Sequence, residues 1–240
     1  GLPHLHSALG DPDPLVRARS ARLLADRGER QARTGLQRLL RDRERRVREA
    51  AEQALEQLSR RPPPPLRVRV LGAFRLFRGD ESVPETAWKR SAAKALLQYL
   101  VSQRPRMMPE EAILEALWPG AEADAAHTAF HAAVHALRKA LEPHLDEARN
   151  SAYILGQKDR YGLNPRAECW VDAEEFARLA HLGKTYQQTG RIEEATRALL
   201  EADRLYAGNY LEESPHLEWA AADRERLRQI EIEVLLRLGD

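Results

Sequence analysis

The chain has 240 residues, of which 31% are charged and 43% are hydrophobic. This balance is typical of a soluble, folded, helix-rich protein of two or three small domains, and it excludes a disordered chain. No run of eighteen apolar residues and no signal peptide occurs, so we expect neither a membrane span nor a membrane partner. The single cysteine, Cys169, excludes an intramolecular disulfide and suits a reducing cytoplasm.

The net charge of +1 hides an asymmetry along the chain. Residues 1–61 carry a net charge of +5, residues 62–165 carry +2 and residues 166–240 carry −6. We therefore expect any polyanion to bind before residue 165. Bulk charge of this size is also common in plain helical proteins, so it does not by itself indicate DNA binding.

The first part of the chain repeats itself. The segment DPDPLVRARSARLL at 11–24 aligns with RDRERRVREAAEQAL at 41–55, and each copy follows a short leucine pattern. Such a period indicates pairs of helices that stack on their neighbours. The strings resemble HEAT-type repeats, so we expect a HEAT-like scaffold at 1–61, with a simple pair of helical hairpins as the alternative.

A stiff linker is expected at 62–65, where four prolines follow one another. The next segments, LRVRVLG and AFRLFRG, alternate apolar and basic residues, which places Leu66, Val68 and Val70 on one face of a strand. A Gly-Asp turn then precedes a third short strand at 82–83. We expect a small antiparallel sheet here.

Three helices are expected after these strands. The first covers about 91–103, and the second begins at Pro109 and ends at Trp118, before a Pro-Gly stop. The third, at about 124–142, is the candidate for DNA recognition. Its apolar residues form one narrow stripe at helical spacing, which comprises Phe130, Val134, Leu137 and Leu141.

The rest of this third helix is short or cationic, which leaves a face that can enter a major groove. The side opposite the stripe holds Thr128, Ala132, Ala136 and Lys139, and the flank holds His127, His131, His135 and Arg138. Alanines allow close approach to base edges and contact thymine methyl groups, while threonine and histidine form hydrogen bonds. Arg138 and Lys139 suit phosphate contacts. The alternative is an ordinary amphipathic helix whose free face packs on another domain.

The segment YILGQKDRYGL at 153–163 predicts a hairpin with a polar, basic tip. The order of strands, helix, EEAILEALWP, long helix ending in LRKALEP, and this hairpin resembles the OmpR-type winged helix. With its C-terminal continuation, the chain resembles the Streptomyces antibiotic regulatory protein family, whose members carry a bacterial transcriptional activator domain. The resemblance covers about 66–240 and implies a winged-helix domain at 66–165.

The resemblance also implies roles for individual residues. Trp118 would lie beside the DNA backbone or RNA polymerase. Thr128, His131, His135, Arg138 and Lys139 would face the groove, and Lys158 and Arg160 would form the tip of the wing. It further implies that two protomers bind direct repeats in a promoter. Relatives often carry more arginine and asparagine on the reading face, and this departure puts base specificity in doubt while docking stays expected.

The histidines at 127, 131 and 135 invite a metal hypothesis, because an i, i+4 pair can bind zinc or nickel. No cysteine lies nearby and no carboxylate stands at an obvious spacing, so no metal site is expected. A second hypothesis is a pH-sensitive affinity for DNA, since imidazoles gain charge below about pH 6.5.

Residues 166–240 read as paired helices with alanines at close contacts and a glycine turn, which resembles tetratricopeptide packing. We expect this activator domain to continue beyond residue 240. No nucleotide-binding loop, zinc-protease motif or nucleophile elbow is found, so we expect neither an enzyme nor a cofactor. The expected fold is mainly α with a small β component. The expected function is a DNA-binding transcriptional regulator, and the alternative is a helical interaction scaffold whose winged helix no longer binds DNA.

Overall fold

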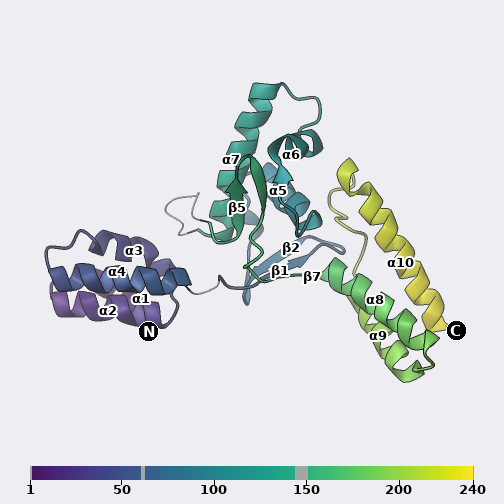
Figure 1. Ribbon diagram of the computed structural model, residues 1–240, viewed down its shortest axis with the longest axis horizontal. Coiled ribbons are helices and arrows are strands. Elements are labelled where there is room, and N and C mark those ends of the chain that lie inside the picture. Colours follow the sequence, from purple (N-terminus) through teal and green to yellow (C-terminus); the bar gives the residue numbers. More distant parts are fainter. Residues whose placement is uncertain (1, 61–62, 144–150, 240) are drawn as a thin grey trace. The chain divides into compact units, whose positions relative to one another are not determined.

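The computed structural model describes residues 2–60, 63–143 and 151–239 (Figure 1). The chain is mainly α-helical with a small β component, as expected. Its internal contacts divide it into two compact units. The first unit comprises Gly1–Pro63, Trp88–Glu110 and Glu122–Arg166. The second unit comprises Pro64–Ala87, Glu111–Ala121 and Ala167–Asp240. Pro62 of the expected linker lies outside the described residues, and the expected domain boundaries stay predictions. No helix among the described residues is long and apolar enough to cross a bilayer.

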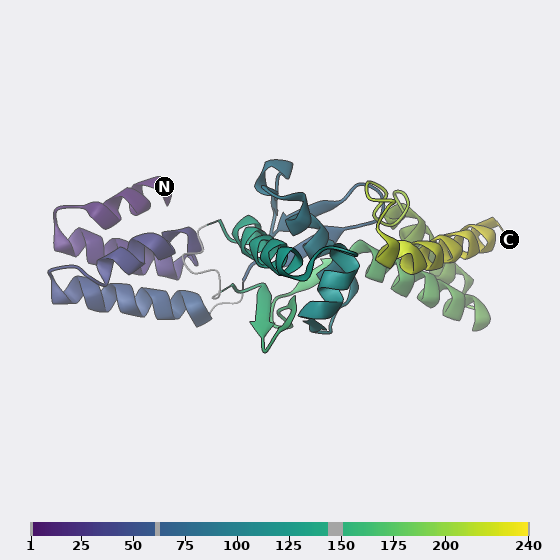
Figure 2. The ribbon, with the colours of Figure 1, turned by 90° about the horizontal axis from the view of Figure 1, so that it is seen from above.

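The N-terminal region of the first unit consists of four α-helices: α1 (Leu2–Ser7), α2 (Pro14–Asp26), α3 (Arg33–Leu39) and α4 (Arg45–Arg60). The two longer helices, α2 and α4, pack side by side (Figures 1 and 2). Their contact buries small and branched apolar side chains, among them Ala21, Leu24 and Val47. The carboxylate of Asp13 accepts a hydrogen bond of 2.8 Å from the Leu15 N–H, which fixes the start of α2.

An arginine network reproduces the sequence repeat in space. Arg17 donates to the carbonyl oxygens of Asp11 (2.8 Å) and its neighbour (3.0 Å), and Arg48 donates to those of Asp42 (2.7 Å) and its neighbour (2.9 Å). Arg17 also makes a two-pronged ion pair with the Asp42 carboxylate, at 2.8 and 2.9 Å. Each arginine therefore closes the loop before its own helix, and Arg17 additionally joins the first copy to the second.

The second part of the first unit contains α5 (Ser91–Ser102), α7 (Ala123–Leu141) and three strands, β4 (Met108–Pro109), β5 (Ile154–Gln157) and β6 (Arg160–Leu163). The strands form a sheet in the order β4-β6-β5, and α5 packs against both α7 and β6. The two helices and the hairpin lie within a few residues of their predicted positions. The short strand β4 was not expected from the sequence.

The second unit holds a four-stranded sheet in the order β3-β2-β1-β7. Its strands are β1 (Leu66–Arg69), β2 (Arg75–Arg78), β3 (Glu81–Ser82) and β7 (Cys169–Val171). The first three pair antiparallel, as predicted, and β1 alternates buried and exposed residues. β7 adds an unexpected parallel strand, in which Cys169 lies opposite Leu66. The sequence predicted these residues to be part of the helical region.

Four α-helices complete this unit: α6 (Glu110–Leu117), of which all but the first residue belong to it, α8 (Asp172–Gln188), α9 (Ile192–Leu205) and α10 (Ala221–Gly239). α8 and α9 form a tight antiparallel pair, and α10 runs alongside them (Figures 1 and 2). Gly183 allows the close approach, because a Cβ there would lie 2.6 Å from the Leu199 side chain. Single turns of 3-10 helix occur at Ala8–Gly10, Arg30–Ala32, Glu85–Ala87 and Glu218–Ala220.

A buried carboxylate ties the sheet to these helices. Asp172, the first residue of α8, accepts hydrogen bonds from the backbone N–H groups of Val70 (2.8 and 3.0 Å), Leu71 (3.1 Å) and Ala173 (2.8 Å). Burial raises the pKa of Asp172 to about 6, although the three N–H groups favour the charged form. The end of β1 and the start of α8 are thus held by one side chain.

Candidate nucleic-acid interface

The long helix α7 has the two-sided character that the sequence predicts. The stripe formed by Phe130, Val134, Leu137 and Leu141 is buried. The carboxylate of Glu122 accepts a hydrogen bond of 3.1 Å from the Ala125 N–H and thereby caps the N-terminus of the helix. The buried stripe holds the helix in the unit while its other side stays accessible.

The predicted groove residues lie mostly on this accessible side. Thr128, His131 and His135 are exposed, and Ala132 and Lys139 are half-buried. The Thr128 hydroxyl donates a hydrogen bond of 2.9 Å to the Asp124 carbonyl oxygen, which leaves its lone pairs available as acceptors. Within the first unit, the structure therefore gathers these five predicted residues on the outer half of one helix.

The predicted wing is present as the β5–β6 hairpin. Gln157 pairs with Arg160, so Lys158 and Asp159 form a two-residue turn, with φ values of 46° and 60°. Positive φ at both positions is what a tight hairpin turn of this length requires. Lys158 and Arg160 are exposed, and Arg160 also donates to the Met107 carbonyl oxygen at 3.2 Å. Two cations therefore stand at the tip of the hairpin.

Arg138 has a partner within its own unit. Its guanidinium is half-buried and donates a hydrogen bond of 3.1 Å to the Ile154 carbonyl oxygen of β5, and its expected phosphate contact stays a prediction. Burial lowers the pKa of this arginine from its ordinary value. A guanidinium held in this way joins α7 to the β5–β6 hairpin.

Trp118 lies just after the end of α6, in the second unit, and is half-buried. Its N–H donates to the Leu114 carbonyl oxygen at 2.8 Å, and its own carbonyl oxygen accepts from Ala121 at 3.2 Å. These bonds form the turn that the Pro-Gly pair predicts. The expected contact of Trp118 with a DNA backbone or with polymerase stays a prediction.

The histidines of α7 have a carboxylate partner that the sequence did not reveal. Glu110 Oε1 lies 2.7 Å from His127 Nδ1 and 3.5 Å from His131 Nε2. The three side chains offer ligand atoms that all lie within 4.8 Å of one another. Glu110 precedes His127 by 17 residues and a turn, so no local spacing rule could have paired them. A carboxylate therefore accompanies these histidines, although none stands at an obvious spacing in the sequence.

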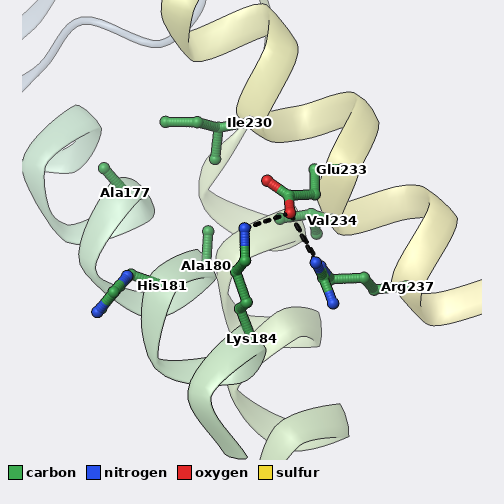
Figure 3. Close-up of a pocket in the computed structure, with 8 residues that line it drawn as sticks. All are labelled: Ala177, Ala180, His181, Lys184, Ile230, Glu233, Val234 and Arg237. Atoms are coloured by element: carbon green, nitrogen blue, oxygen red, sulfur yellow. Dashed lines mark hydrogen bonds and ion pairs between the residues drawn. The ribbon is translucent and has the colours of Figure 1, made fainter. Parts of the chain in front are cut away.

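A groove with a volume of about 160 Å3 lies between α8 and α10 (Figure 3). Glu233 Oε1 accepts from Lys184 Nζ at 2.9 Å and from Arg237 at 2.7 Å (Figure 3). These hydrogen bonds, from Arg237 above all, hold the pKa of Glu233 below its usual range. Both cations of the groove are thus already paired, and their evident effect is to join α8 to α10.

Comparisons with known proteins cover both ends of the chain. Residues 2–71 match the family described as HEAT repeats, although the helices of this region end at Arg60 and the match runs on into β1. Residues 171–240 match the family described as bacterial transcriptional activator domain. No curated protein matches the chain.

One solved structure shares the fold over most of the chain. It is Mycobacterium tuberculosis EmbR in complex with a low affinity phosphopeptide, with a TM-score of 0.59 and 24% sequence identity. The similarity covers 70% of this chain and 43% of EmbR, so the chain spans less than half the length of that protein. The comparisons agree with the expected HEAT-like start and with a C-terminal region of the kind found in bacterial transcriptional activators.

Proposed function

We propose that the chain is a DNA-binding transcriptional regulator in which α5, α6, α7 and the β5–β6 hairpin act as a winged helix. The observation that carries the proposal is the accessible outer half of α7 together with a hairpin that bears two exposed cations. In this arrangement, α7 enters the major groove and the hairpin follows the minor groove. The match of residues 171–240 to the activator domain supports a role in transcription.

The outer half of α7 provides several ways to read a duplex. Thr128, His131 and His135 would form hydrogen bonds with base edges, and Ala132 would contact a thymine methyl group. Lys139 would reach a phosphate. Few of these contacts are charged, so we expect specific affinity to depend strongly on Lys158 and Arg160.

The acidic helical region would provide protein contacts. Its net charge of −6 disfavours DNA, so α8–α10 are better suited to hold a second protomer on direct repeats or to contact RNA polymerase. We further propose, from the sequence patterns and the family resemblance, an activator that works in the cytoplasm, without enzymatic activity of its own.

The test is a titration of a duplex from the region upstream of the gene, followed by fluorescence anisotropy at several salt concentrations. Affinity should fall steeply with salt, because each neutralised phosphate releases counterions. Replacing Lys158 and Arg160 with alanine should weaken binding about tenfold and lower the salt slope by about 2. A matched control replaces two exposed arginines of α9, Arg197 and Arg204, and should leave both values unchanged.

A helical interaction scaffold is the second candidate. Two acids, Glu122 and Asp124, stand at the start of α7, and no lysine or arginine occurs on this helix before Arg138. A face of this composition also suits a protein partner. The scaffold predicts no anisotropy change at any salt concentration, which would refute the DNA-binding proposal.

A further inference from the structure

The cluster of Glu110, His127 and His131 has the chemistry of a metal site. The two histidines are four residues apart on α7, so their rings project from the same side of the helix, one turn apart. The Glu110 carboxylate reaches both rings through one oxygen, Oε1, at 2.7 and 3.5 Å. Two imidazole nitrogens and one carboxylate oxygen form a donor set that binds zinc in proteins and leaves a fourth position for water.

The carboxylate is held firmly, whereas the rings are open to solvent. The Glu110 side chain is 8% exposed, while those of His127 and His131 are 49% and 59% exposed. The backbone N–H of Glu110 donates a hydrogen bond of 2.8 Å to the Asp159 carbonyl oxygen in the hairpin turn. Because the Glu110 side chain is fixed and the two imidazoles beside it are accessible, a metal ion can bind from solvent while the unit stays folded.

The separations of Glu110 Oε1 from the two imidazole nitrogens are close to those around a bound ion, and all three ligand atoms lie within 4.8 Å of one another. Zinc bonds of roughly 2.1 Å at tetrahedral angles place neighbouring ligand atoms roughly 3.3 Å apart. The contact from Glu110 to His131 already has this length, at 3.5 Å. The contact from Glu110 to His127, at 2.7 Å, is a hydrogen bond. It would lengthen by roughly 0.6 Å as the metal ion replaces the proton between the two atoms. The geometry points to a divalent transition-metal site at Glu110, His127 and His131, with zinc as its ion.

Zinc binding at this site would change the charge on the side of α7 that faces a duplex. Zinc with one carboxylate and two neutral imidazoles leaves one net positive charge at the site. The ion would also join Glu110 to α7 beside the hairpin turn. This consequence rests on the proposed function. Zinc would take His131 Nε2 in place of a base contact, and its added positive charge predicts DNA affinity several-fold higher in zinc than in a chelator. The metal site itself does not depend on DNA binding.

The experiment titrates the protein, without DNA, with Co²⁺ followed by visible absorption, and with Zn²⁺ in competition against a chromophoric chelator. We expect one site that produces a tetrahedral Co²⁺ spectrum, which zinc abolishes. Glu110→Gln, His127→Ala and His131→Ala should each weaken this site at least tenfold. Circular dichroism of each variant establishes that the helices are retained, since both histidines are largely exposed.

The matched control is His135→Ala, which removes an exposed histidine one turn further along α7 and should leave the site intact. Absence of a site at micromolar metal would overturn the inference. Wild-type affinity in Glu110→Gln, or equal losses in His131→Ala and His135→Ala, would also overturn it, because either result assigns binding to histidines alone. If metal binds as expected while DNA does not bind, the proposed function fails and the metal site stands.

Discussion

Removal of the buried Asp172 carboxylate should destabilise the second unit. It is 3% exposed and accepts from three backbone N–H groups, those of Val70, Leu71 and Ala173. Replacement by alanine leaves these donors without their acceptor, at a net cost of about 1 kcal/mol each. The free energy of unfolding at pH 7.5 should therefore fall by about 3 kcal/mol, measured by urea titration with circular dichroism.

The same substitution has a pH signature with a defined sign. The pKa of Asp172 is raised to about 6 in the folded chain, from 3.8 in the unfolded chain. The folded state thus holds the proton more tightly, and this group's contribution is complete below pH 3.8 and is lost as the pH rises to 6. A pKa raised by about 2 corresponds to about 3 kcal/mol. The loss of unfolding free energy caused by Asp172→Ala should therefore be larger at pH 4 than at pH 7.5, by up to that amount.

The control is Glu201→Ala, on the exposed surface of α9, which should change the unfolding free energy by less than about 0.5 kcal/mol. A cost below about 1 kcal/mol for Asp172→Ala at pH 7.5 would refute the hydrogen-bond argument. A cost that shrinks toward acid pH would refute the direction of the pKa shift.

Three further substitutions test packing and turn geometry. Gly183→Leu should destabilise the α8–α9 pair by about 2 kcal/mol or more in thermal melts, because even a Cβ would lie 2.6 Å from Leu199; an unchanged melting temperature would exclude the close approach. Asp159→Gly should stabilise the hairpin by up to about 1 kcal/mol, since its φ of 60° suits glycine, and a lower melting temperature would contradict this. Arg138→Leu should accelerate amide hydrogen exchange in β5, because it removes the hydrogen bond to the Ile154 carbonyl oxygen. Unaltered exchange would show that this bond does not stabilise β5 and would favour the predicted phosphate contact.

The sequence predicted what depends on local periodicity. The stripe of α7 was found because helical spacing places Phe130 and Leu137 on one face, and both are buried. Burial alternates along β1 as predicted from its alternating residues. The hairpin was found from two short runs around Lys158, whose side chain is exposed. Each of these patterns is contained within a few consecutive residues.

What the sequence analysis missed depends on pairings between distant residues. β7 has only three residues and pairs with a strand about a hundred positions earlier, so no local pattern identifies it. Glu110 approaches His127 only after the chain has turned between two helices. Arg138 carries the same charge whether it faces phosphate or a carbonyl oxygen, and only the fold decides between them.

The parallel pairing of β7 with β1 affects how chimeric proteins should be designed. A fusion that exchanges the acidic helices at residue 165 removes the neighbour of Leu66–Arg69 and leaves that strand with an open edge. Unpaired N–H and C=O groups along such an edge recruit strands from other molecules, which leads to aggregation. A junction near residues 62–65 keeps both strands in one piece, so the proline segment is the better site for recombining these modules.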